Sequence, residues 1–328
     1  MILVTGASGF LGQHLVQSLC AGATPVRALY HRNPPAERLR QLPHVTWMSC
    51  DLLDIFAVEQ AFEGVTAVYH CAAKVSFEAA DQYLIQQVNT ESTANVVNTA
   101  LEAGIRKLVF VSSIATLGRG NLNKPLSEND FWEESKNNTA YARSKYLAEM
   151  EVWRGMAEGL NAVIVNPAII LGPGNWAEGS ARLMQIAYRE FPFYTEGVNG
   201  WVGVQDVVKA MIQLMESDIA EERFIVCEGN HGYREIFTQM ATALGKKPPS
   251  LKAPDWATGL LWRWNALRKA LTGKKATVTK ETTRTAQMKC CYNNEKLLQA
   301  LPGFRYTPID QVIGEMASAF IGEKSVNA

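Results

Sequence analysis

Tyr141 and Lys145 have the residue types and the spacing of a general acid/base pair. Side chains at positions i and i+4 lie on the same face of a helix. A tyrosine in water has a pKa of about 10 and is therefore a weak base at neutral pH. A neighbouring ammonium favours the phenolate and lowers that pKa toward the range in which acid/base catalysis works. The same spacing also fits two exposed side chains on a helix, so the upstream residues decide between the two interpretations.

A serine that follows a buried strand is the third candidate catalytic residue. Residues 108–111 are apolar and predict a strand that runs into Ser112 and Ser113. Open parallel sheets hold their ligands at the carboxyl ends of the strands. Ser113 is therefore placed to hold a substrate oxygen, although a hydroxyl that caps a turn explains the residue as well.

The first 22 residues predict a strand, a glycine-rich turn and a helix. Glycines without Cβ atoms let backbone N–H groups approach a pyrophosphate at a helix N-terminus, where the helix dipole favours the anion. The third glycine lets helix and strand approach closely. We therefore expect a dinucleotide at this turn, whose sequence is Thr5-Gly6-Ala7-Ser8-Gly9-Phe10-Leu11-Gly12.

The end of the second expected strand, residues 25–30, bears on the choice of cofactor. An acidic residue there would accept a hydrogen bond from the NAD ribose, but the chain has Tyr30-His31-Arg32. We expect NADP, with Arg32 or His31 facing the 2′-phosphate, while NAD stays open and Arg32 also fits an exposed loop position. After a third strand, Asp51 and Leu52 are expected to meet the adenine.

The next expected strand, residues 67–73, ends in small residues, and Ala72 and Ala73 would let the cofactor lie across the strand end. His70 in this strand has no partner at a metal-ligand spacing, so we expect no metal site. A long helix over residues 81–103 carries Asn89. Thr139 is the expected N-cap of the helix that carries Tyr141.

A further strand at residues 161–166 is followed by a segment in which Gly, Pro and aromatic residues accumulate, including Trp176 and Trp201. We interpret this change as the start of substrate-handling elements. Residues 1–166 with 201–227 would form the dinucleotide-binding domain, and residues 167–200 with 228–328 the substrate domain. The Trp-rich, basic segment 256–275 fits a helix that packs over a pocket, and it also fits a helix in peripheral contact with a membrane surface.

Charge and composition exclude several classes of partner. Lys plus Arg and Asp plus Glu are both 32, so the net charge is zero and no overall field attracts nucleic acid. The six cysteines lack metal-type spacing, and we expect reduced thiols. The chain opens as a strand without the pattern of a signal peptide, and no uncharged run approaches the ~18 residues of a membrane span. We expect a cytoplasmic protein.

Taken together, five motifs resemble an extended short-chain dehydrogenase/reductase, the superfamily of NAD-dependent epimerases and dehydratases. The likeness covers about residues 1–227 and is nearest to the dihydroflavonol reductase, 3β-hydroxysteroid dehydrogenase and sugar-nucleotide epimerase branches. It rests on the glycine turn, Asp51-Leu52, Val111-Ser112-Ser113, Tyr141-Ala142-Arg143-Ser144-Lys145 and Asn166-Pro167-Ala168-Ile169-Ile170-Leu171-Gly172-Pro173-Gly174.

The resemblance implies an α/β fold with a doubly wound, Rossmann-type parallel sheet and a smaller C-terminal substrate domain. It implies that Tyr141 is the catalytic acid/base, that Ser113 bonds the reacting oxygen, and that Lys145 binds the nicotinamide ribose and depresses the tyrosine pKa. Pro167 joins the cofactor-binding residues, and Asn89 occupies the helix asparagine of the family.

The expected function is an NAD(P)-dependent oxidoreductase that interconverts a secondary alcohol and a ketone on a bulky, partly apolar small molecule. The aromatic residues after position 175 and segment 256–275 favour the apolar substrate. A nucleotide-sugar epimerase or dehydratase with tightly bound NAD is an alternative, supported by Asn166-Pro167. A non-catalytic NADP-binding redox sensor is another alternative. The family also suggests a homodimer through the long helices expected near residues 81–103 and 140–158.

Overall fold

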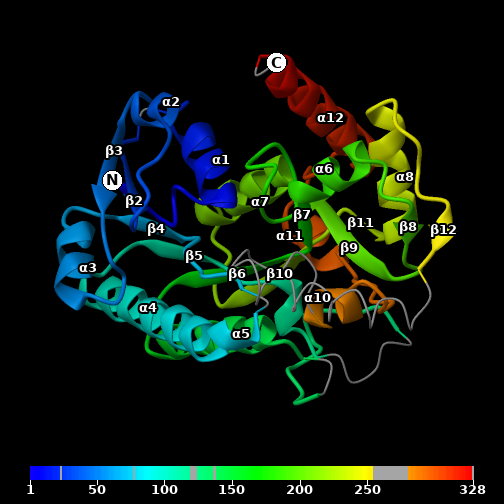
Figure 1. Cartoon of the computed structure of the whole chain (residues 1–328). Coiled ribbons are helices and arrows are strands. Elements are labelled where there is room, and N and C mark those ends of the chain that lie inside the picture. Colours follow the sequence, from blue (N-terminus) through cyan, green and yellow to red (C-terminus); the bar gives the residue numbers. More distant parts are fainter. Residues whose placement is uncertain (23, 77, 119–123, 136–137, 254–279, 327–328) are drawn as a thin grey trace.

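A seven-stranded parallel sheet forms the centre of the protein in the computed structural model (Figure 1). The structure describes residues 1–328 except 23, 77, 119–123, 136–137, 254–279 and 327–328. Because both faces of the sheet are covered, its central strands are nearly continuous apolar runs. In spatial order the strands are β10 (Glu222–Val226), β6 (Ala162–Pro167), β5 (Lys107–Val111), β4 (Ala67–His70), β1 (Ile2–Thr5), β2 (Val26–Tyr30) and β3 (Val45–Ser49).

Helices cover both faces of this sheet, as expected for a doubly wound fold (Figure 1). Successive strand residues point to opposite faces, so Val4 and Val109 lie in one core while Leu3 and Leu108 lie in the other. The first core is covered by α1 (Phe10–Leu19) and α7 (Val204–Glu216). The second core is covered by α3 (Ile55–Phe62), α4 (Gln82–Glu102) and α5 (Ala140–Ala157).

A second, smaller unit lies beside the carboxyl ends of β6 and β10 (Figure 1). Its three-stranded sheet has the order β11 (Gly229–Gly232), β9 (Val198–Gly203) and β7 (Ile169–Leu171). A separate apolar core joins this sheet to α6 (Arg182–Tyr188), α8 (Tyr233–Ala243) and α12 (Ile309–Val326). Residues 201–203, which the sequence analysis assigned to the dinucleotide-binding domain, pair in the small sheet. The following α7 packs on the large sheet, and β10 is one of its strands. That this unit binds the substrate stays a prediction.

The remaining elements are short. The strands β8 (Phe193–Tyr194) and β12 (Leu251–Lys252) pair with each other, and two 3-10 turns are η1 (Ala79–Asp81) and η2 (Ile114–Thr116). The short helices are α2 (Glu37–Arg40), α10 (Lys280–Thr285) and α11 (Glu295–Ala300). No helix in the described part of the chain is long and apolar enough to cross a membrane.

Several expectations are confirmed and two are corrected. The Rossmann-type sheet, the two long helices and the free state of the six cysteines agree with the sequence analysis. The strand expected over residues 67–73 ends at His70, because the following residues leave the ladder to pack against the glycine turn. Trp176 and Trp201 lie in the apolar core of the smaller unit, so they do not argue for an apolar substrate. Segment 256–275 lies outside the described residues.

Candidate active site

Helix α5 carries the tyrosine and the lysine at its N-terminal end. Its N-cap is Thr139, as expected, because the threonine side chain accepts a hydrogen bond from Ala142 N. The cap fixes the first turn, in which Tyr141 is only partly buried. Lys145 lies one turn later on the same face and is 2% exposed.

Ser113 lies at the carboxyl end of β5 and directly before η2. Its side chain hydrogen-bonds the Tyr141 phenol, so the structure brings together the two hydroxyl groups that the sequence analysis placed in one site. Burial raises the pKa of Tyr141 above its ordinary value, and the hydrogen bond to Ser113 opposes that rise. The phenol therefore keeps its proton at neutral pH.

The ammonium group of Lys145 contacts the end of β5. Its Nζ donates to Val111 O at 2.8 Å and lies 4.5 Å from the centroid of the Phe110 ring. Desolvation lowers the pKa of Lys145 to about 8, and the negative charge of Glu149 opposes this shift. Burial and the hydrogen bond to Ser113 account for the shift in the pKa of Tyr141 in this structure, and a contribution of Lys145 to that pKa stays a prediction.

The glycine turn has the shape that a pyrophosphate needs. Gly6 has φ of +62°, and a Cβ on it would lie 2.7 Å from Ala72 Cα. Gly9 N donates to Gly6 O at 3.0 Å, and a Cβ on Gly12 would overlap Gly6 O. Gly9, the N-cap of α1, has no side chain that could cap the helix, so the first backbone N–H groups of α1 can bind an anion. These residues fit a dinucleotide.

The four-residue strand β4 ends at a buried histidine that joins the glycine turn to α4. Thr93 Oγ1 donates to Asn89 O at 2.8 Å, so it accepts from His70 Nε2 at 3.0 Å. His70 Nδ1 then accepts from Thr5 Oγ1 at 2.7 Å, and Thr5 in turn accepts from Ala72 N at 3.2 Å. Burial lowers the pKa of His70 to about 3, so its ring is neutral. This chain holds the strand end against the glycine turn.

Asn89 in α4 connects the same region to the catalytic helix. Its amide bonds the backbone of Lys74 twice, with Asn89 Oδ1 2.7 Å from Lys74 N and Nδ2 3.0 Å from Lys74 O. Asn89 Nδ2 also lies 3.0 Å from Ser144 Oγ, whose hydroxyl donates to Tyr141 O. The asparagine therefore ties the segment after β4 to the first turns of α5.

The predicted adenine and 2′-phosphate residues lie at neighbouring strand ends, because β2 pairs with β3. His31 Nε2 is 3.4 Å from Asp51 Oδ2, and both side chains are about half exposed. Arg32 is exposed beside them. Pro167 ends β6, and the following Ala168 N donates to Val226 O at 3.0 Å.

A buried polar cluster behind Ser113 escaped the sequence analysis. It contains Glu149, which is fully buried, and Arg223, which is 7% exposed. Two signals were available: Glu149 follows Lys145 by four residues on one helix face, and Arg223 directly precedes the apolar run 224–227. Asn166 points into this cluster and donates to Ser113 O at 3.1 Å and to Glu149 Oε2 at 3.0 Å. Its amide nitrogen is therefore engaged inside the protein.

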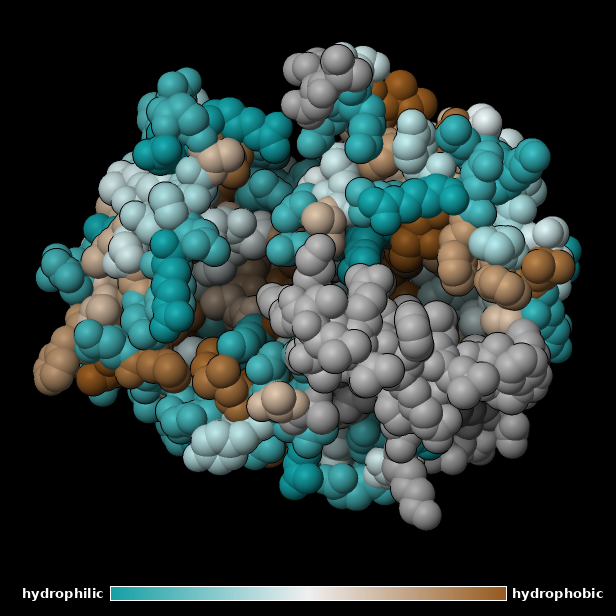
Figure 2. All heavy atoms as spheres, in the orientation of Figure 1, coloured by the Kyte–Doolittle hydropathy of each residue, from teal (hydrophilic) through white to brown (hydrophobic). Residues whose placement is uncertain are grey.

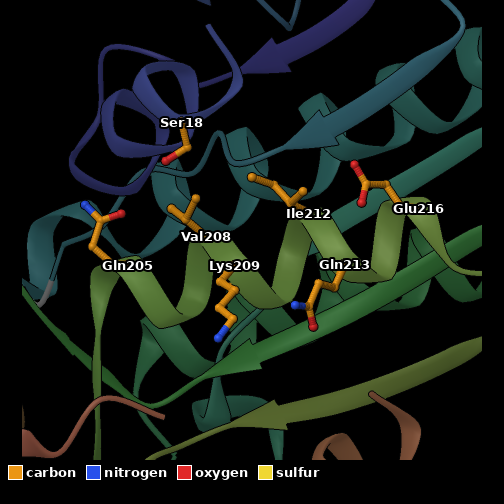
Figure 3. A pocket seen from close by; sticks show the side chains of 7 residues that line it. All are labelled: Ser18, Gln205, Val208, Lys209, Ile212, Gln213 and Glu216. Atoms are coloured by element: carbon orange, nitrogen blue, oxygen red, sulfur yellow. The ribbon is translucent and has the colours of Figure 1, made fainter. Parts of the chain in front are cut away.

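A surface groove lies outside this site. An open groove between α1 and α7, lined by residues such as Ser18 and Lys209, shares no lining residue with the glycine turn or the catalytic residues (Figure 3). Among the described residues, no group of three or more His, Cys, Asp or Glu side chains could hold a metal ion.

The profile of the NAD dependent epimerase/dehydratase family matches residues 2–227. Sterol demethylase protein B from Methylococcus capsulatus is 31% identical over 77% of each chain. A putative dihydroflavonol 4-reductase from Synechocystis is 26% identical over 97% of this chain and 93% of its own. UDP-glucose 4-epimerase from Vibrio cholerae is 28% identical over 78% of this chain and 79% of its own.

Solved structures agree with the fold. The structure titled gox2253 has a TM-score of 0.82 at 26% identity over 98% of both chains. The UDP-glucose 4-epimerase of Thermotoga maritima has a TM-score of 0.80 at 19% identity, over 98% of this chain and 99% of its own. The chain belongs to the NAD dependent epimerase/dehydratase family, within the extended short-chain dehydrogenases/reductases.

Proposed function

We propose that this protein is an NADP-preferring oxidoreductase that interconverts a secondary alcohol and a ketone on a bulky, partly apolar small molecule. The observation that carries the proposal is the hydrogen bond between the Ser113 side chain and the Tyr141 phenol, with Lys145 buried on the same helix. A bound nicotinamide cofactor supplies the hydride. Ser113 holds the ketone oxygen, and Tyr141 gives that oxygen its proton.

Tyr141 is a neutral phenol at neutral pH, because its pKa lies above the ordinary value. A phenol that keeps its proton is ready to donate it, whereas alcohol oxidation needs the phenolate. We therefore expect the rate of oxidation to rise with pH above neutrality, while the rate of reduction stays level. Initial rates in both directions across the pH range measure this difference.

The names of the relatives support an apolar substrate. One is named for sterol demethylation and another for dihydroflavonol reduction, and both words describe fused-ring compounds. The core positions of Trp176 and Trp201 remove part of the support that the sequence offered.

The test is to incubate the purified protein with NADPH and a panel that contains a ketosteroid and a dihydroflavonol. We expect NADPH oxidation with at least one ketone and a loss of about 100-fold or more in kcat for Tyr141→Phe. Tyr146→Phe is the matched control, because this tyrosine lies on the same helix and stacks on Trp132 with ring centroids 4.7 Å apart. No oxidation with any ketone, or full activity in Tyr141→Phe, would reject the proposal.

Arg32 is proposed to bind the 2′-phosphate of NADP, because it is exposed at the end of β2, where no acidic residue follows Tyr30. Arg32→Ala should raise KM for NADPH about tenfold and leave KM for NADH unchanged, since only NADPH carries the extra phosphate. Arg40→Ala is the control, because Arg40 pairs with Glu37 on the surface at 2.8 Å. An equal rise for both cofactors would exclude a role in recognising the phosphate.

A nucleotide-sugar epimerase is the second candidate, favoured by the relative from Vibrio cholerae. Such an enzyme would keep NAD through purification and convert UDP-glucose without added cofactor. The support that Asn166 offered is weaker in the structure, because this side chain is fully buried and its amide nitrogen faces Ser113 O, Thr116 and Glu149. Protein that purifies without NAD and leaves UDP-glucose unchanged would exclude this candidate.

A further inference from the structure

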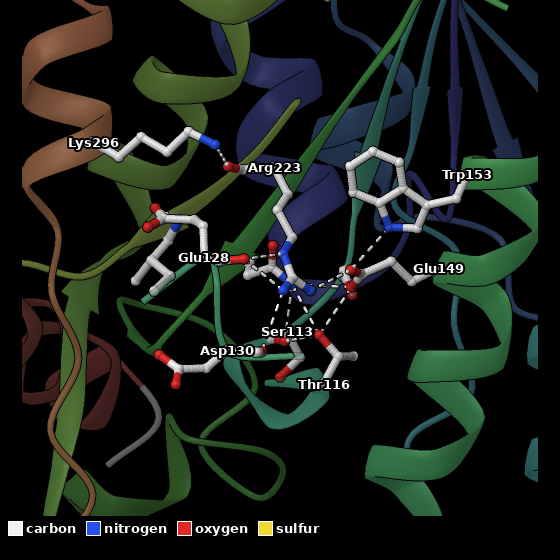
Figure 4. A network of polar contacts seen from close by, with 11 residues as sticks. Ser113, Thr116, Glu128, Asp130, Glu149, Trp153, Arg223 and Lys296 are labelled. Carbon is white, nitrogen blue, oxygen red and sulfur yellow. Dashed lines mark hydrogen bonds and ion pairs between the residues drawn. The ribbon is translucent and has the colours of Figure 1, made fainter. Parts of the chain in front are cut away.

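A carboxylate is buried one turn beyond Lys145 on the catalytic helix. Glu149 is fully buried, and such a group must be paired or hydrogen-bonded if it is to stay ionised. Figure 4 shows its two oxygens facing different partners. Oε1 accepts from Arg223 Nη1 at 3.1 Å and from Trp153 Nε1 at 3.4 Å. One oxygen of Glu149 is therefore fixed by an arginine and a tryptophan inside the protein.

The other oxygen, Oε2, faces the segment that carries Ser113. It accepts from the Ser112 hydroxyl, lies 2.9 Å from Thr116 Oγ1 and accepts from Asn166 Nδ2 at 3.0 Å. Ser112 and Thr116 bracket Ser113 along the chain, so one carboxylate oxygen holds this segment on both sides of the catalytic serine (Figure 4).

The backbone of Ser113 is held by the same cluster. Ser113 O accepts from Asn166 Nδ2 at 3.1 Å, and the same amide nitrogen donates to Glu149 Oε2. The single hydroxyl proton of Thr116 lies between two acceptors, Ser113 O and Glu149 Oε2, each 2.9 Å from Thr116 Oγ1. The backbone position of Ser113 therefore depends on a carboxylate that belongs to the helix of Tyr141. Glu149 lies two helical turns from that tyrosine, so the serine is set in place relative to the same rigid element.

Arg223 fixes the orientation of the carboxylate. This arginine comes from β10 and is itself held by backbone carbonyls, because Nε and Nη2 donate to Glu128 O at 2.9 and 2.6 Å and Nη2 donates to Asp130 O at 3.2 Å. A guanidinium stays charged and presents donors in a rigid, planar arrangement. Glu149 Oε1 is thereby held on the strand side, which leaves Oε2 for the serine segment (Figure 4).

We propose that Glu149, oriented by Arg223, is a positioning residue that sets the place of Ser113 relative to the Tyr141 phenol. Its effect on turnover rests on the proposed function, whereas its effect on the Ser113–Tyr141 hydrogen bond does not. A purely structural ion pair would contribute to folding without any effect on that hydrogen bond. Apolar pairs often replace buried ion pairs with little loss of stability, so stability and positioning can be tested separately.

The first experiment compares Glu149→Gln with Glu151→Gln in the full chain. Glu151 lies on the same helix and pairs with Arg154 on the surface at 3.0 Å, so it is the matched control. With NADPH and the ketone that the wild type reduces best, Glu149→Gln should lower kcat about 10- to 100-fold, because small misplacements of catalytic groups have effects of this size. The KM for NADPH should stay within about twofold, since the glycine turn is unchanged. Full kcat in a folded Glu149→Gln protein would overturn the proposal.

The second experiment does not need turnover. Protein labelled isotopically at tyrosine Cζ gives an NMR signal for Tyr141, assigned through its absence in Tyr141→Phe, that reports whether the phenol keeps its hydrogen bond to Ser113. Glu149→Gln should shift this signal toward that of Ser113→Ala, and Glu151→Gln should leave it in place. An unshifted Tyr141 signal in Glu149→Gln would overturn the positioning role even if the proposed function is correct. A protein without turnover in which the signal shifts as expected would refute the proposed function alone.

A third variant serves if Glu149→Gln fails to fold. Ser112→Ala removes one of the groups that Oε2 holds, and it leaves both the bond between Thr116 and Ser113 O and the ion pair between Glu149 and Arg223 intact. We expect a folded protein that repeats the loss in kcat and the shift of the Tyr141 signal. Wild-type values for both in this variant would overturn the proposal.

Discussion

At the scale of single residues, burial decides the protonation states in this site. Desolvation holds a proton on Tyr141, keeps His70 neutral and brings the pKa of Lys145 to about 8. A neighbouring group opposes the effect of burial in two of these cases. The hydrogen bond from Ser113 lowers the pKa of Tyr141, and the charge of Glu149 raises the pKa of Lys145. At neutral pH Tyr141 is therefore a neutral phenol and His70 a neutral imidazole.

The depressed pKa of His70 makes stability depend on pH. Below about pH 6.5 the unfolded chain binds a proton that the folded protein, with a pKa of about 3, does not bind, so stability falls as the pH drops through this range. Between about pH 7 and about pH 5 this group should remove about 2 kcal/mol from the free energy of unfolding. Urea unfolding at both pH values measures the free energy of unfolding of the wild type and of His70→Asn. The variant should not lose this part of its stability when the pH is lowered.

His44→Asn is the control for that experiment. His44 is exposed and has φ of +60°, a conformation that asparagine adopts readily, so the substitution should be tolerated. The control should keep the full pH dependence of the wild type. The assignment to His70 fails if His70→Asn loses as much stability on acidification as the wild type does.

At the scale of elements, two glycines with similar backbone conformations have different tasks. Gly6 and Gly64 have φ of +62° and +70°, but a Cβ would meet Ala72 only at Gly6, and nothing lies within 4 Å at Gly64. Gly64→Ala should therefore cost about 1–2 kcal/mol of unfolding free energy and leave cofactor affinity unchanged. Gly6→Ala should lower the free energy of unfolding further and weaken NADPH binding about tenfold or more, because the backbone of the glycine turn must shift to make room for the methyl group.

Fluorescence titration with NADPH and urea unfolding separate these two effects. A Gly6→Ala protein that binds NADPH as tightly as the wild type would show that the turn does not hold the cofactor. If Gly64→Ala also bound NADPH more weakly, backbone strain alone would explain the weaker binding of Gly6→Ala.

The N-caps of α5 and α3 offer a second matched pair. Thr139 accepts from Ala142 N, and Asp54 accepts from Phe56 N and Ala57 N. Replacement of either residue by alanine should lower the free energy of unfolding by about 1 kcal/mol. Only Thr139→Ala should also lower kcat, because Tyr141 lies in the turn that this cap fixes. Equal kcat in the two variants would show that fraying of this turn does not reach the phenol.

At the scale of the whole molecule, α4 and α5 lie side by side on one face of the sheet (Figure 1), and Figure 2 shows apolar side chains among the polar ones on the surface. A homodimer through these two helices stays a prediction. Tyr83 is 79% exposed and Leu84 is 42% exposed at the start of α4, which fits such a contact.

Light scattering tests this prediction by measuring the mass of the protein in solution. The wild type should have the mass of a dimer, and Tyr83→Lys with Leu84→Lys should have that of a monomer, because two added charges oppose burial. Ile321→Lys on α12 is the control, since Ile321 is 45% exposed on a helix of the smaller unit. A monomeric wild type would contradict the prediction directly.

The sequence by itself determined the features that depend on local chemistry and order along the chain. The glycine turn between a strand and a helix, the serine after a buried strand, the capped helix with Tyr141 and Lys145, and the parallel sheet all follow from residue type and spacing. Local backbone preferences and side-chain periodicity are enough to specify them.

Only the tertiary structure decided what depends on residues far apart in the sequence. It directed Lys145 to Val111 O and gave Tyr141 a raised pKa, because burial is a property of the packed core. It placed Trp201 inside the smaller unit, away from any exposed surface. It also joined Glu149 to Arg223 across 74 positions of the chain, a contact that no local pattern encodes.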